Sequence, residues 1–479
     1  MQLRQQLLDG LLYVSDGLAS ARWNFPDAIG SSKENPAGIG QPAQVSYSFL
    51  ANPPTEYNWG RSFRSFDSDG RKAAKRAIDT IAAIANISFE ADSRPAAGSI
   101  RFGQNAQASS QAGFAYSPSF SYSFGSDGII LNVTELDRGG DVWLNSGINY
   151  KPADYQPGGQ GLGSLMHELG HAIGLKHPFE GKQPLSKTLE SNQYTVMSYT
   201  PHPKSKLVQF SQEQTAAGTL TKWSTSDLDP RSLMLGDIAA IQALYGANRK
   251  TNAGATIYRY SDTDVFFETI WDGGGIDTLD CSSMQQHCII SLNPGSFSSI
   301  GLRDSAESLR ALHKVPSQIA LSKLDPNLYN GSNNLAIAFD CDIENATGSR
   351  ANDSIVGNAL ANTLRGGLGA DQITGGGGSD RFCFDRVDES PVGSSKRDLI
   401  RDFNSSQGDR IDLTAIDADP GKAGRQAFRY IGAAGFSGQP GEVRFSQGLL
   451  QANLNADRNA EFELALTGVN AFARSSLIV

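Results

Sequence analysis

The residues best suited to chemistry lie in one stretch between His167 and His177, which holds three of the six histidines of the chain. His167 and His171 are four positions apart, so on a helix both imidazoles lie on the same face. Two imidazoles on one face can bind a single Zn²⁺ at about 2.0–2.1 Å each. Glu168 lies next to that face, where a carboxylate can polarise a metal-bound water. The spacing therefore predicts a zinc-binding helix with a general base beside the metal.

The third histidine, His177, needs a break in the helix to reach the same metal. On an uninterrupted helix it would lie about 15 Å from His167, at about 1.5 Å of rise per residue. Gly174 lies between the second and third histidines, and glycine readily adopts the left-handed conformation that ends a helix. We therefore expect the chain to turn back at Gly174. Three protein nitrogens would leave coordination positions open, as in catalytic rather than structural zinc sites.

The wider pattern resembles a known family of zinc proteases. The stretch from His167 to His177 is similar to the metzincin signature, and a later stretch, Tyr194-Thr195-Val196-Met197-Ser198-Tyr199, resembles its Met-turn. Pro178 directly after the third histidine, and a tyrosine two residues after the methionine, point to the serralysin branch of that family.

The resemblance implies a secreted zinc endopeptidase with one catalytic Zn²⁺. It assigns the role of general base to Glu168, and it implies that Tyr199 can ligate zinc and swing away during turnover. Met197 is implied to pack beneath the metal without binding it. His202 is close in sequence, but we interpret it as a surface histidine.

Several predicted elements must position these residues. The zinc helix is expected to start near Gly163 or Ser164, with Ser164 as its N-cap. Further helices are predicted at 3–14, 70–86 and 237–246, and strands near 45–49, 100–102, 129–133 and 142–144. Residues 26–44 are rich in Gly, Pro and Ser and are interpreted as loop.

Length and composition limit the remaining possibilities. At 479 residues the chain is expected to form two or three domains. The net charge of −9 argues against a nucleic-acid partner and suits a carboxylate-rich calcium binder, although a solvated acidic surface would look the same. No apolar run is long enough for a membrane span. Residues 1–10 have no adequate apolar segment for a Sec-type signal peptide.

An internal repeat of nine residues occupies 348–383. Its four copies begin at Gly348, Gly357, Gly366 and Gly375. The sixth positions are Asp353, Asn362, Asp371 and Asp380, and the eighth are Ile355, Leu364, Ile373 and Phe382. This is the pattern of the calcium-binding parallel β-roll of RTX proteins. A flexible glycine linker is the alternative, but a linker has no reason to keep apolar residues at the eighth position.

The period has a direct consequence for calcium. Each nonamer makes half a coil, so loops on the same edge are two repeats apart. One Ca²⁺ is therefore expected between Asp353 and Asp371, and another between Asn362 and Asp380, with backbone carbonyls completing the oxygen cage. Because Asn362 lacks a charge, we expect the second site to be weaker.

The family resemblance extends these calcium sites and covers nearly the whole chain. It implies ligands at Asn252, Gly254, Thr256, Asp272, Gly274 and Asp277, loop positions at Gly366, Gly375 and Gly377, and a closing segment with Asp398 and Asp402. The fold class implied is an α+β metzincin-like zinc protease domain at 1–246. It is followed at 247–479 by an all-β parallel β-roll with a β-sandwich-like C-terminal part.

The resemblance also implies partners and a compartment. Protein or peptide substrates, a type I secretion transporter and several structural Ca²⁺ ions are expected for an extracellular monomer, and a proteinaceous inhibitor is a possible partner. The last residues, 475–479, stand where the family has an uncleaved export signal, with Ser476 in place of the usual acid.

Three questions stay open on the residues alone. Cys281 and Cys288 are close enough in sequence to be bridged, but small buried thiols in strands are favoured. The chain could be a calcium-dependent adhesion or toxin module with a degenerate protease domain, although the intact zinc ligands and base argue against it. A metallohydrolase acting on something other than peptide is disfavoured by the Met-turn.

Overall fold

The computed structural model describes the chain except residues 1, 16–17, 20, 25–28, 31–37, 58–61, 93–99 and 216–217. The predicted loop at 26–44 lies largely outside the described residues. The chain divides into two compact units. The first comprises 1–251, 266–273 and 315–329, and the second comprises 252–265, 274–314 and 330–479. Within the described part of the chain, no helix combines the length and apolar character needed to cross a bilayer.

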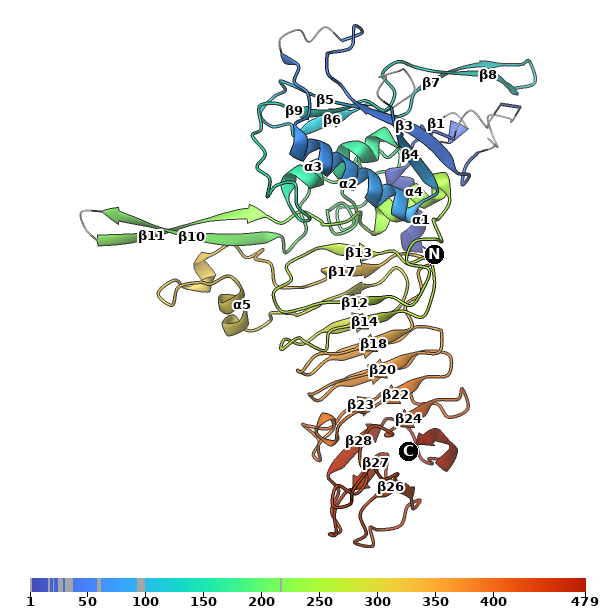
Figure 1. Ribbon diagram of the computed structural model, residues 1–479, viewed down its shortest axis with the longest axis vertical. Helices are drawn as coiled ribbons and strands as arrows, with labels where there is room; N and C mark the ends of the chain where they lie inside the picture. The colour runs from blue at the N-terminus through green and yellow to red at the C-terminus, as the bar shows by residue number, and fades with distance from the viewer. Residues whose placement is uncertain are drawn as a thin grey trace. The chain divides into compact units, whose positions relative to one another are not determined.

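A five-stranded sheet organises the first unit (Figure 1). Its strands, in spatial order, are β4 (Ile87–Ala91), β3 (Ala43–Phe49), β5 (Ile100–Asn105), β9 (Val142–Asn145) and β6 (Gly113–Ala115). Neighbouring strands are parallel except that β6 is antiparallel to β9. The predicted strands at 45–49, 100–102 and 142–144 are confirmed, and the one at 129–133 is confirmed as β8 (Ile130–Glu135), which pairs with β7 (Phe120–Phe124).

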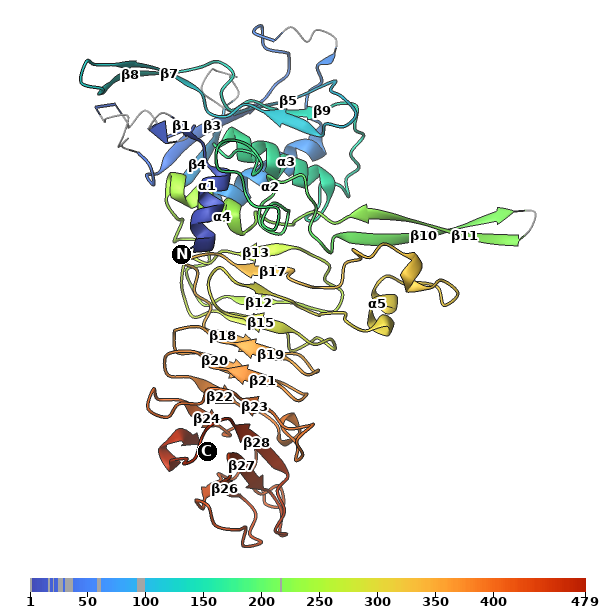
Figure 2. The same ribbon diagram turned by 180° about the vertical axis from the view of Figure 1, so that it is seen from behind.

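Two helices pack on one face of this sheet, α2 (Ser68–Ile84) and α3 (Gln160–Ala172) (Figures 1 and 2). The predicted helix at 70–86 is α2, which starts two residues earlier because Asp67 caps it by accepting a hydrogen bond from the N–H of Gly70 at 2.7 Å. Its apolar stripe, which includes Ile78 and Ile81, is buried as expected.

The first unit has two more helices, α1 (Gln2–Leu11) and α4 (Leu235–Tyr245), which pack against each other. Gly246 ends α4 with a φ of 77°, as its position predicted. A hairpin of two ten-residue strands, β10 (Lys206–Thr215) and β11 (Gly218–Asp227), precedes α4. The remaining short strands of this unit are β1 (Val14–Ser15), β2 (Leu18–Ala19) and β13 (Glu268–Ile270).

The predicted start of the zinc helix is wrong. Helix α3 begins at Gln160 with Gly159 as its N-cap, and Ser164 lies inside the helix with its Oγ 3.1 Å from the Tyr150 hydroxyl. The glycines before Ser164 suggest a loop by propensity, but tertiary packing overrides this. A Cβ on Gly161 would lie 2.8 Å from the Tyr155 ring, so the helix can pack there only with glycine.

The second unit is a roll of two sheets. One has strands in the order β12 (Ile257–Arg259), β14 (Thr278–Asp280), β18 (Asn345–Thr347), β20 (Thr363–Arg365), β22 (Arg381–Cys383), β24 (Arg410–Asp412) and β29 (Leu477–Ile478). The other has β15 (Ile289–Ser291), β19 (Ser354–Val356), β21 (Gln372–Thr374), β23 (Leu399–Ile400), β28 (Phe462–Leu466), β27 (Leu449–Asn453), β26 (Glu442–Ser446) and β25 (Arg429–Tyr430). A short pair, β16 (Phe297–Ser298) and β17 (Leu335–Ile337), and helix α5 (Ala306–Leu312) also belong to this part of the chain.

Successive nonamers alternate between the two sheets, which confirms that each makes half a coil. Parallel pairing joins β18 to β20 and β19 to β21, each eighteen residues apart. The eighth-position side chains are all buried between the sheets: Ile355, Leu364, Ile373 and Phe382. The linker alternative is therefore wrong.

The expected β-sandwich-like C-terminal part is not a separate structure among the described residues. Strand β28 pairs in parallel with β23, and β26, β27 and β28 form an antiparallel extension of the same sheet. Strand β29 extends the opposite sheet through β24. The C-terminal strands therefore continue the roll, because its last coils offer unpaired edges that need hydrogen-bond partners. Cys281 and Cys288 are free, buried thiols, as favoured from the sequence.

Candidate active site

The three histidines of the central stretch converge on one point. The Nε2 atom of His177 lies 3.2 Å from Nε2 of His167 and 3.0 Å from Nε2 of His171. Tetrahedral zinc with bonds of about 2.0–2.1 Å would separate its nitrogen ligands by about 3.3 Å. The turn that brings His177 back occurs at Gly174, whose φ is 112°. A Cβ there would lie 2.1 Å from the carbonyl oxygen of Ala21, so only glycine fits.

The other ring nitrogen of each histidine has a partner that orients the ring. The Nδ1 atom of His167 lies 2.8 Å from the carbonyl oxygen of Val196, and that of His171 lies 2.9 Å from the carbonyl oxygen of Leu175. The Nδ1 atom of His177 lies 2.8 Å from Oε1 of Glu180. Because all three acceptors need a proton on Nδ1, each Nε2 keeps a lone pair that points at the common centre.

Electrostatics keep the imidazoles in the form that binds a metal. Burial, together with the neighbouring His171, lowers the pKa of His167 to about 3. Burial and the neighbouring His177 lower the pKa of His171 to about 4. Both rings are therefore neutral at physiological pH, and neutral nitrogen donors in this geometry fit Zn²⁺.

Glu168 is buried directly beside this centre, with 5 % of its surface exposed. Burial raises the pKa of its carboxyl to about 8, and its Oε2 has no hydrogen-bond partner among the described residues. A cation at the imidazole nitrogens would stabilise the ionised carboxylate, so the unpartnered oxygen fits a metal site as well. Gly113 on strand β6 makes room for this side chain, because a Cβ there would lie 3.0 Å from Oε1 of Glu168.

Tyr199 contacts one of the three histidines, and Met197 contacts the helix that carries two of them. The Tyr199 hydroxyl lies 2.8 Å from Nε2 of His177, and the side chain is 67 % exposed. Met197 is fully buried, and its Sδ would lie 2.5 Å from a Cβ on Gly170 of α3. The methionine therefore packs against the helix that carries the zinc histidines, and the glycine permits the close approach.

Two supporting carboxylates were missed by sequence reasoning. Asp237 is buried and accepts hydrogen bonds from the Thr195 hydroxyl at 2.6 Å, the Val196 N–H at 2.9 Å and the Met234 N–H at 2.8 Å. It thereby ties the Met-turn to the start of α4. Glu180, which orients His177, is the other. Its only signal in the sequence is that an acid follows the third zinc histidine by three residues.

The interpretation of His202 as a surface residue is wrong. Its side chain is buried, and the ring stacks on Phe267 with centroids 3.8 Å apart. Its Nδ1 accepts a hydrogen bond from the N–H of Lys204 at 3.0 Å. Segment 266–273, which lies far away in sequence, covers this histidine, so the local sequence gives no sign of burial.

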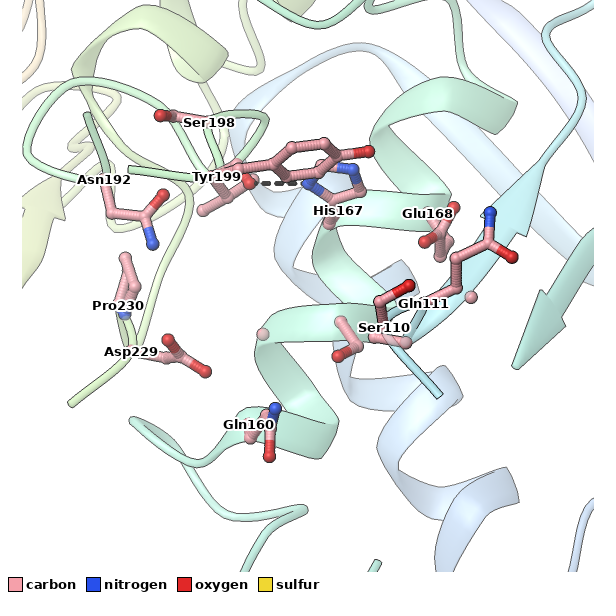
Figure 3. Close-up of a pocket in the computed structure, with 15 residues that line it drawn as sticks. Ser110, Gln111, Gln160, His167, Glu168, Asn192, Ser198, Tyr199, Asp229 and Pro230 are labelled. Atoms are coloured by element: carbon pink, nitrogen blue, oxygen red, sulfur yellow. Dashed lines mark hydrogen bonds between the residues drawn. The ribbon is translucent and has the colours of Figure 1, made fainter. Parts of the chain in front are cut away.

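An open pocket of about 580 Å³ leads to Glu168 and His167. Figure 3 shows both side chains on α3, with Asp229 and Pro230 on the segment opposite. A smaller pocket of about 250 Å³ adjoins the other side of the histidines. Strand β6 borders both pockets and is the edge strand of its sheet.

The carboxylates of the roll form a repeated arrangement in the second unit. The N–H of Asp353 donates to Oδ1 of Asp371 at 2.7 Å, and the N–H of Asp371 donates to Oδ1 of Asp398 at 2.8 Å. The Oδ2 atoms of Asp371 and Asp398 are buried and have no hydrogen-bond partner among the described residues. Burial raises the pKa of both carboxyls. Buried carboxylates without a countercharge fit an oxygen-liganded cation such as Ca²⁺.

The loops two repeats apart lie side by side, as predicted. A Cβ on Gly348 would lie 2.2 Å from the carbonyl oxygen of Gly366, and one on Gly357 would lie 2.2 Å from that of Gly375. On the second edge, the N–H of Asn362 donates to Oδ1 of Asp380 at 2.9 Å. The structure therefore brings together the paired loop residues that the period selected.

Three of the remaining predicted calcium residues, Asn252, Gly254 and Asp277, are hydrogen-bonded to a fourth, Thr256. The Thr256 N–H donates to Oδ1 of Asp277 at 2.7 Å, and the Thr256 hydroxyl donates to the carbonyl oxygens of Asn252 at 3.3 Å and Gly254 at 3.1 Å. Gly274 has a φ of 136°. Asp272 belongs to the first unit and is buried.

Two more predicted calcium residues, Asp402 and Gly377, have hydrogen-bond partners in the loops of the roll. Asp402 accepts hydrogen bonds from the N–H groups of Gly375 at 2.8 Å and Gly376 at 2.9 Å, and the N–H of Gly377 donates to the carbonyl oxygen of Asn358 at 2.9 Å. These contacts hold the turn in place. They leave the carboxylate of Asp402 occupied by backbone donors.

Comparisons with known proteins agree with this geometry. The family model described as "Peptidase M10 serralysin C terminal" matches residues 237–312 and 328–479. A serralysin of Photorhabdus luminescens is 32% identical over 433 residues, which are 84% of this chain and 76% of the relative. Metalloprotease AprA of Pseudomonas entomophila is 31% identical over 475 residues, 91% of this chain and 85% of the relative.

One solved structure, that of myroilysin, is 14% identical and covers 44% of this chain and 95% of its own, with a TM-score of 0.22. At that score the likeness carries no conclusion. The two metalloprotease relatives do, because they extend over most of both chains. On that evidence the chain belongs to the serralysin family and is a zinc metalloendopeptidase.

Proposed function

We propose that this protein is a secreted endopeptidase that hydrolyses extracellular proteins at the zinc centre of His167, His171 and His177, and that a calcium-stabilised roll supports its folding after export. The observation that carries the proposal is the convergence of three imidazole nitrogens beside the buried Glu168. A metal site with open positions and a carboxylate beside it is the combination that metal-assisted hydrolysis requires.

The substrate would bind in extended form along strand β6. This strand pairs with β9 on one side only. The carbonyl of Ala112 and the N–H of Tyr116 are hydrogen-bonded toward β9. Because an antiparallel ladder alternates, the backbone groups of Gly113 and Ala115 face away from β9 and are available to a peptide.

The chain's own residues then supply the proton transfers. A bound zinc ion would polarise the scissile carbonyl and lower the pKa of the attacking water. Glu168 accepts the proton of that water and passes it to the leaving amine. Burial raises the pKa of this carboxyl, and a bound cation would favour the carboxylate form that accepts the proton.

Tyr199 is placed to act on the oxygen of the tetrahedral intermediate. Its hydroxyl lies beside the convergence point, and its exposed ring leaves room for movement. Burial and the nearby Glu168 raise the pKa of this phenol, so it is a neutral hydrogen-bond donor at physiological pH. A donor aimed at the developing oxyanion stabilises the transition state more than the bound substrate.

The roll explains the compartment in this proposal. Extracellular calcium modules bind at roughly 10⁻⁴–10⁻³ M, which is met outside cells and not in cytosol. The C-terminal residues, proposed as the signal for a type I transporter, form β29 on the last coil. They would therefore be accessible before the roll folds and paired afterwards. A proteinaceous inhibitor remains a prediction, as does the monomeric state.

A casein zymogram with and without 1,10-phenanthroline tests the proposal. We expect a clearing band that the chelator abolishes and that Glu168→Gln reduces by roughly 10²–10⁴-fold while zinc stays bound at one equivalent. Casein hydrolysis by Glu168→Gln at the normal rate would contradict the mechanism. Absence of any hydrolysis by the calcium-loaded protein would favour the adhesion module with a degenerate protease domain.

A further inference from the structure

A second carboxylate, Asp229, lines the same pocket as Glu168 (Figure 3). It follows the end of β11 by two residues, and its N–H donates to the carbonyl oxygen of Gly158 at 3.2 Å. Within the described part of the chain, its side chain makes no hydrogen bond or ion pair. No Lys or Arg is among the residues that line the pocket. Apart from the proposed zinc centre, the pocket therefore has two carboxylates and no Lys or Arg side chain in its lining.

The position of this carboxylate is set by helix α3. A Cβ on Gly163 would lie 2.9 Å from Oδ2 of Asp229, so the carboxylate reaches the helix surface only because residue 163 is glycine. Gly163 and His167 are four residues apart on one face of the helix, about one turn or 5.4 Å along its axis. Asp229 thus meets α3 one helical turn before His167, where a long side chain next to the scissile bond would reach it.

Strand β6 indicates which substrate residue that is. Gln111 and Gly113 border both pockets, but the larger pocket extends to Ser110 and Ala112 before β6, and the smaller one extends to Ala115 at its end and Ser117 beyond it. Antiparallel pairing is the more stable and more common arrangement. A peptide antiparallel to β6 runs from the smaller pocket to the larger one, so its residue after the scissile bond faces Asp229.

We propose that Asp229 makes the larger pocket a subsite for a basic side chain, Lys or Arg, on the residue that follows the scissile bond. The proposal rests on the endopeptidase function above. A long basic side chain can bury its apolar stem along the pocket wall and place its charge on the carboxylate. Gln160 and Asn192, which also line the pocket, can accept the other donors of that group.

The electrostatics of the pocket agree with a missing cation. Burial and the neighbouring Asp227 raise the pKa of Asp229 to about 6. The ionised form therefore prevails at neutral pH, although nothing among the described residues compensates its charge. A substrate ammonium or guanidinium supplies that compensation, and an acidic substrate side chain would be repelled.

The test compares peptides that differ only at the residue after the scissile bond, Lys, Gln or Glu, with the full-length protein loaded with zinc and calcium. We expect kcat/KM for the Lys peptide to exceed that for the Gln peptide by roughly ten- to hundred-fold. Asp229→Asn should bring this ratio close to one, and Asp229→Lys should favour the Glu peptide. Asp227→Asn, which removes a carboxylate two residues away and outside the pocket lining, should keep the ratio.

Equal cleavage of the Lys and Gln peptides by the unmodified protein overturns the inference, even if a variant fails to fold. An unchanged ratio in folded Asp229→Asn overturns it as well, and so does a preference for basic residues at a different position. If the protein cleaves neither these peptides nor casein, the proposed endopeptidase function itself is wrong, which separates the two failures.

Discussion

The two units hold their proposed metal ions by opposite means. In the first, three imidazoles converge, and each ring is already oriented by an acceptor beside its Nδ1 atom. In the second, buried carboxylates such as Asp371 and Asp398 keep one oxygen without a partner among the described residues. A neutral ring can stay buried without its metal, whereas a buried charge is costly until a cation arrives.

The contrast separates two roles for metals in one chain. A zinc site built from oriented neutral donors can form before the metal binds, so the metal adds chemistry to a fold that already exists. We expect carboxylates stacked on successive coils to need a cation in order to fold, so that calcium would supply stability. Removing each metal should therefore have a different effect.

Calcium removal should give the largest effect. With excess EGTA we expect the second unit to lose its protected backbone amides, because its buried carboxylates would repel one another without cations. Hydrogen exchange followed by mass spectrometry should show this loss in residues 345–412 while α3 and α4 stay protected. Treatment with 1,10-phenanthroline should instead abolish activity and leave the exchange of the roll unchanged. Amide protection in the roll that is indifferent to EGTA would break the comparison.

Glu180→Gln tests the orientation of the zinc ligands. The carboxylate accepts from Nδ1 of His177, and loss of such a partner commonly weakens metal affinity by roughly 10–100-fold. We expect this decrease in competition with a zinc chelator, with the fold retained. Glu213→Gln, which removes a carboxylate paired with Lys222 in the β10–β11 hairpin, is the matched control. Equal zinc affinity in both variants would show that the orientation of His177 does not depend on Glu180.

The two edges of the roll should differ in calcium affinity, because Asn362 stands where the other loops have aspartate. Its Nδ2 donates to the carbonyl oxygen of Glu344 at 2.9 Å and to Oδ1 of Asn358 at 3.0 Å, which partly replaces a cation. Asp371→Asn should raise the calcium concentration at the folding midpoint by roughly three- to ten-fold, and Asn362→Asp should lower it. A calcium titration followed by circular dichroism measures both, and shifts in the same direction would contradict the charge argument.

The smallest effect concerns pH. Because the pKa of Asp229 is raised to about 6, its carboxylate is ionised above that pH and becomes protonated below it. The preference for a basic residue should therefore be present at pH 7–8 and decline as the pH falls through about 6. His167, Glu168 and Tyr199 also line the pocket, so Asp229→Asn, in which this decline should be absent, isolates the contribution of Asp229. A ratio that stays constant from pH 5 to 8 would contradict this assignment.

The sequence by itself determined the features that depend on short repeats. Helix geometry alone predicted that His167 and His171 share one face and that the chain must break at Gly174. The nine-residue period alone predicted the coils of the roll. The buried eighth-position side chains and the paired loops were predicted for the same reason.

Only the tertiary structure decided the features that join distant segments. Local propensity does not encode the packing that supplies acceptors for the zinc histidines. It does not encode the burial of His202 under Phe267 or the start of α3 at Gln160 either. The same holds for Asp229, which lies far from Gly163 in sequence and meets it across the pocket. Periodic patterns are local and can be read along the chain, whereas the partner of a buried polar group is chosen by the fold.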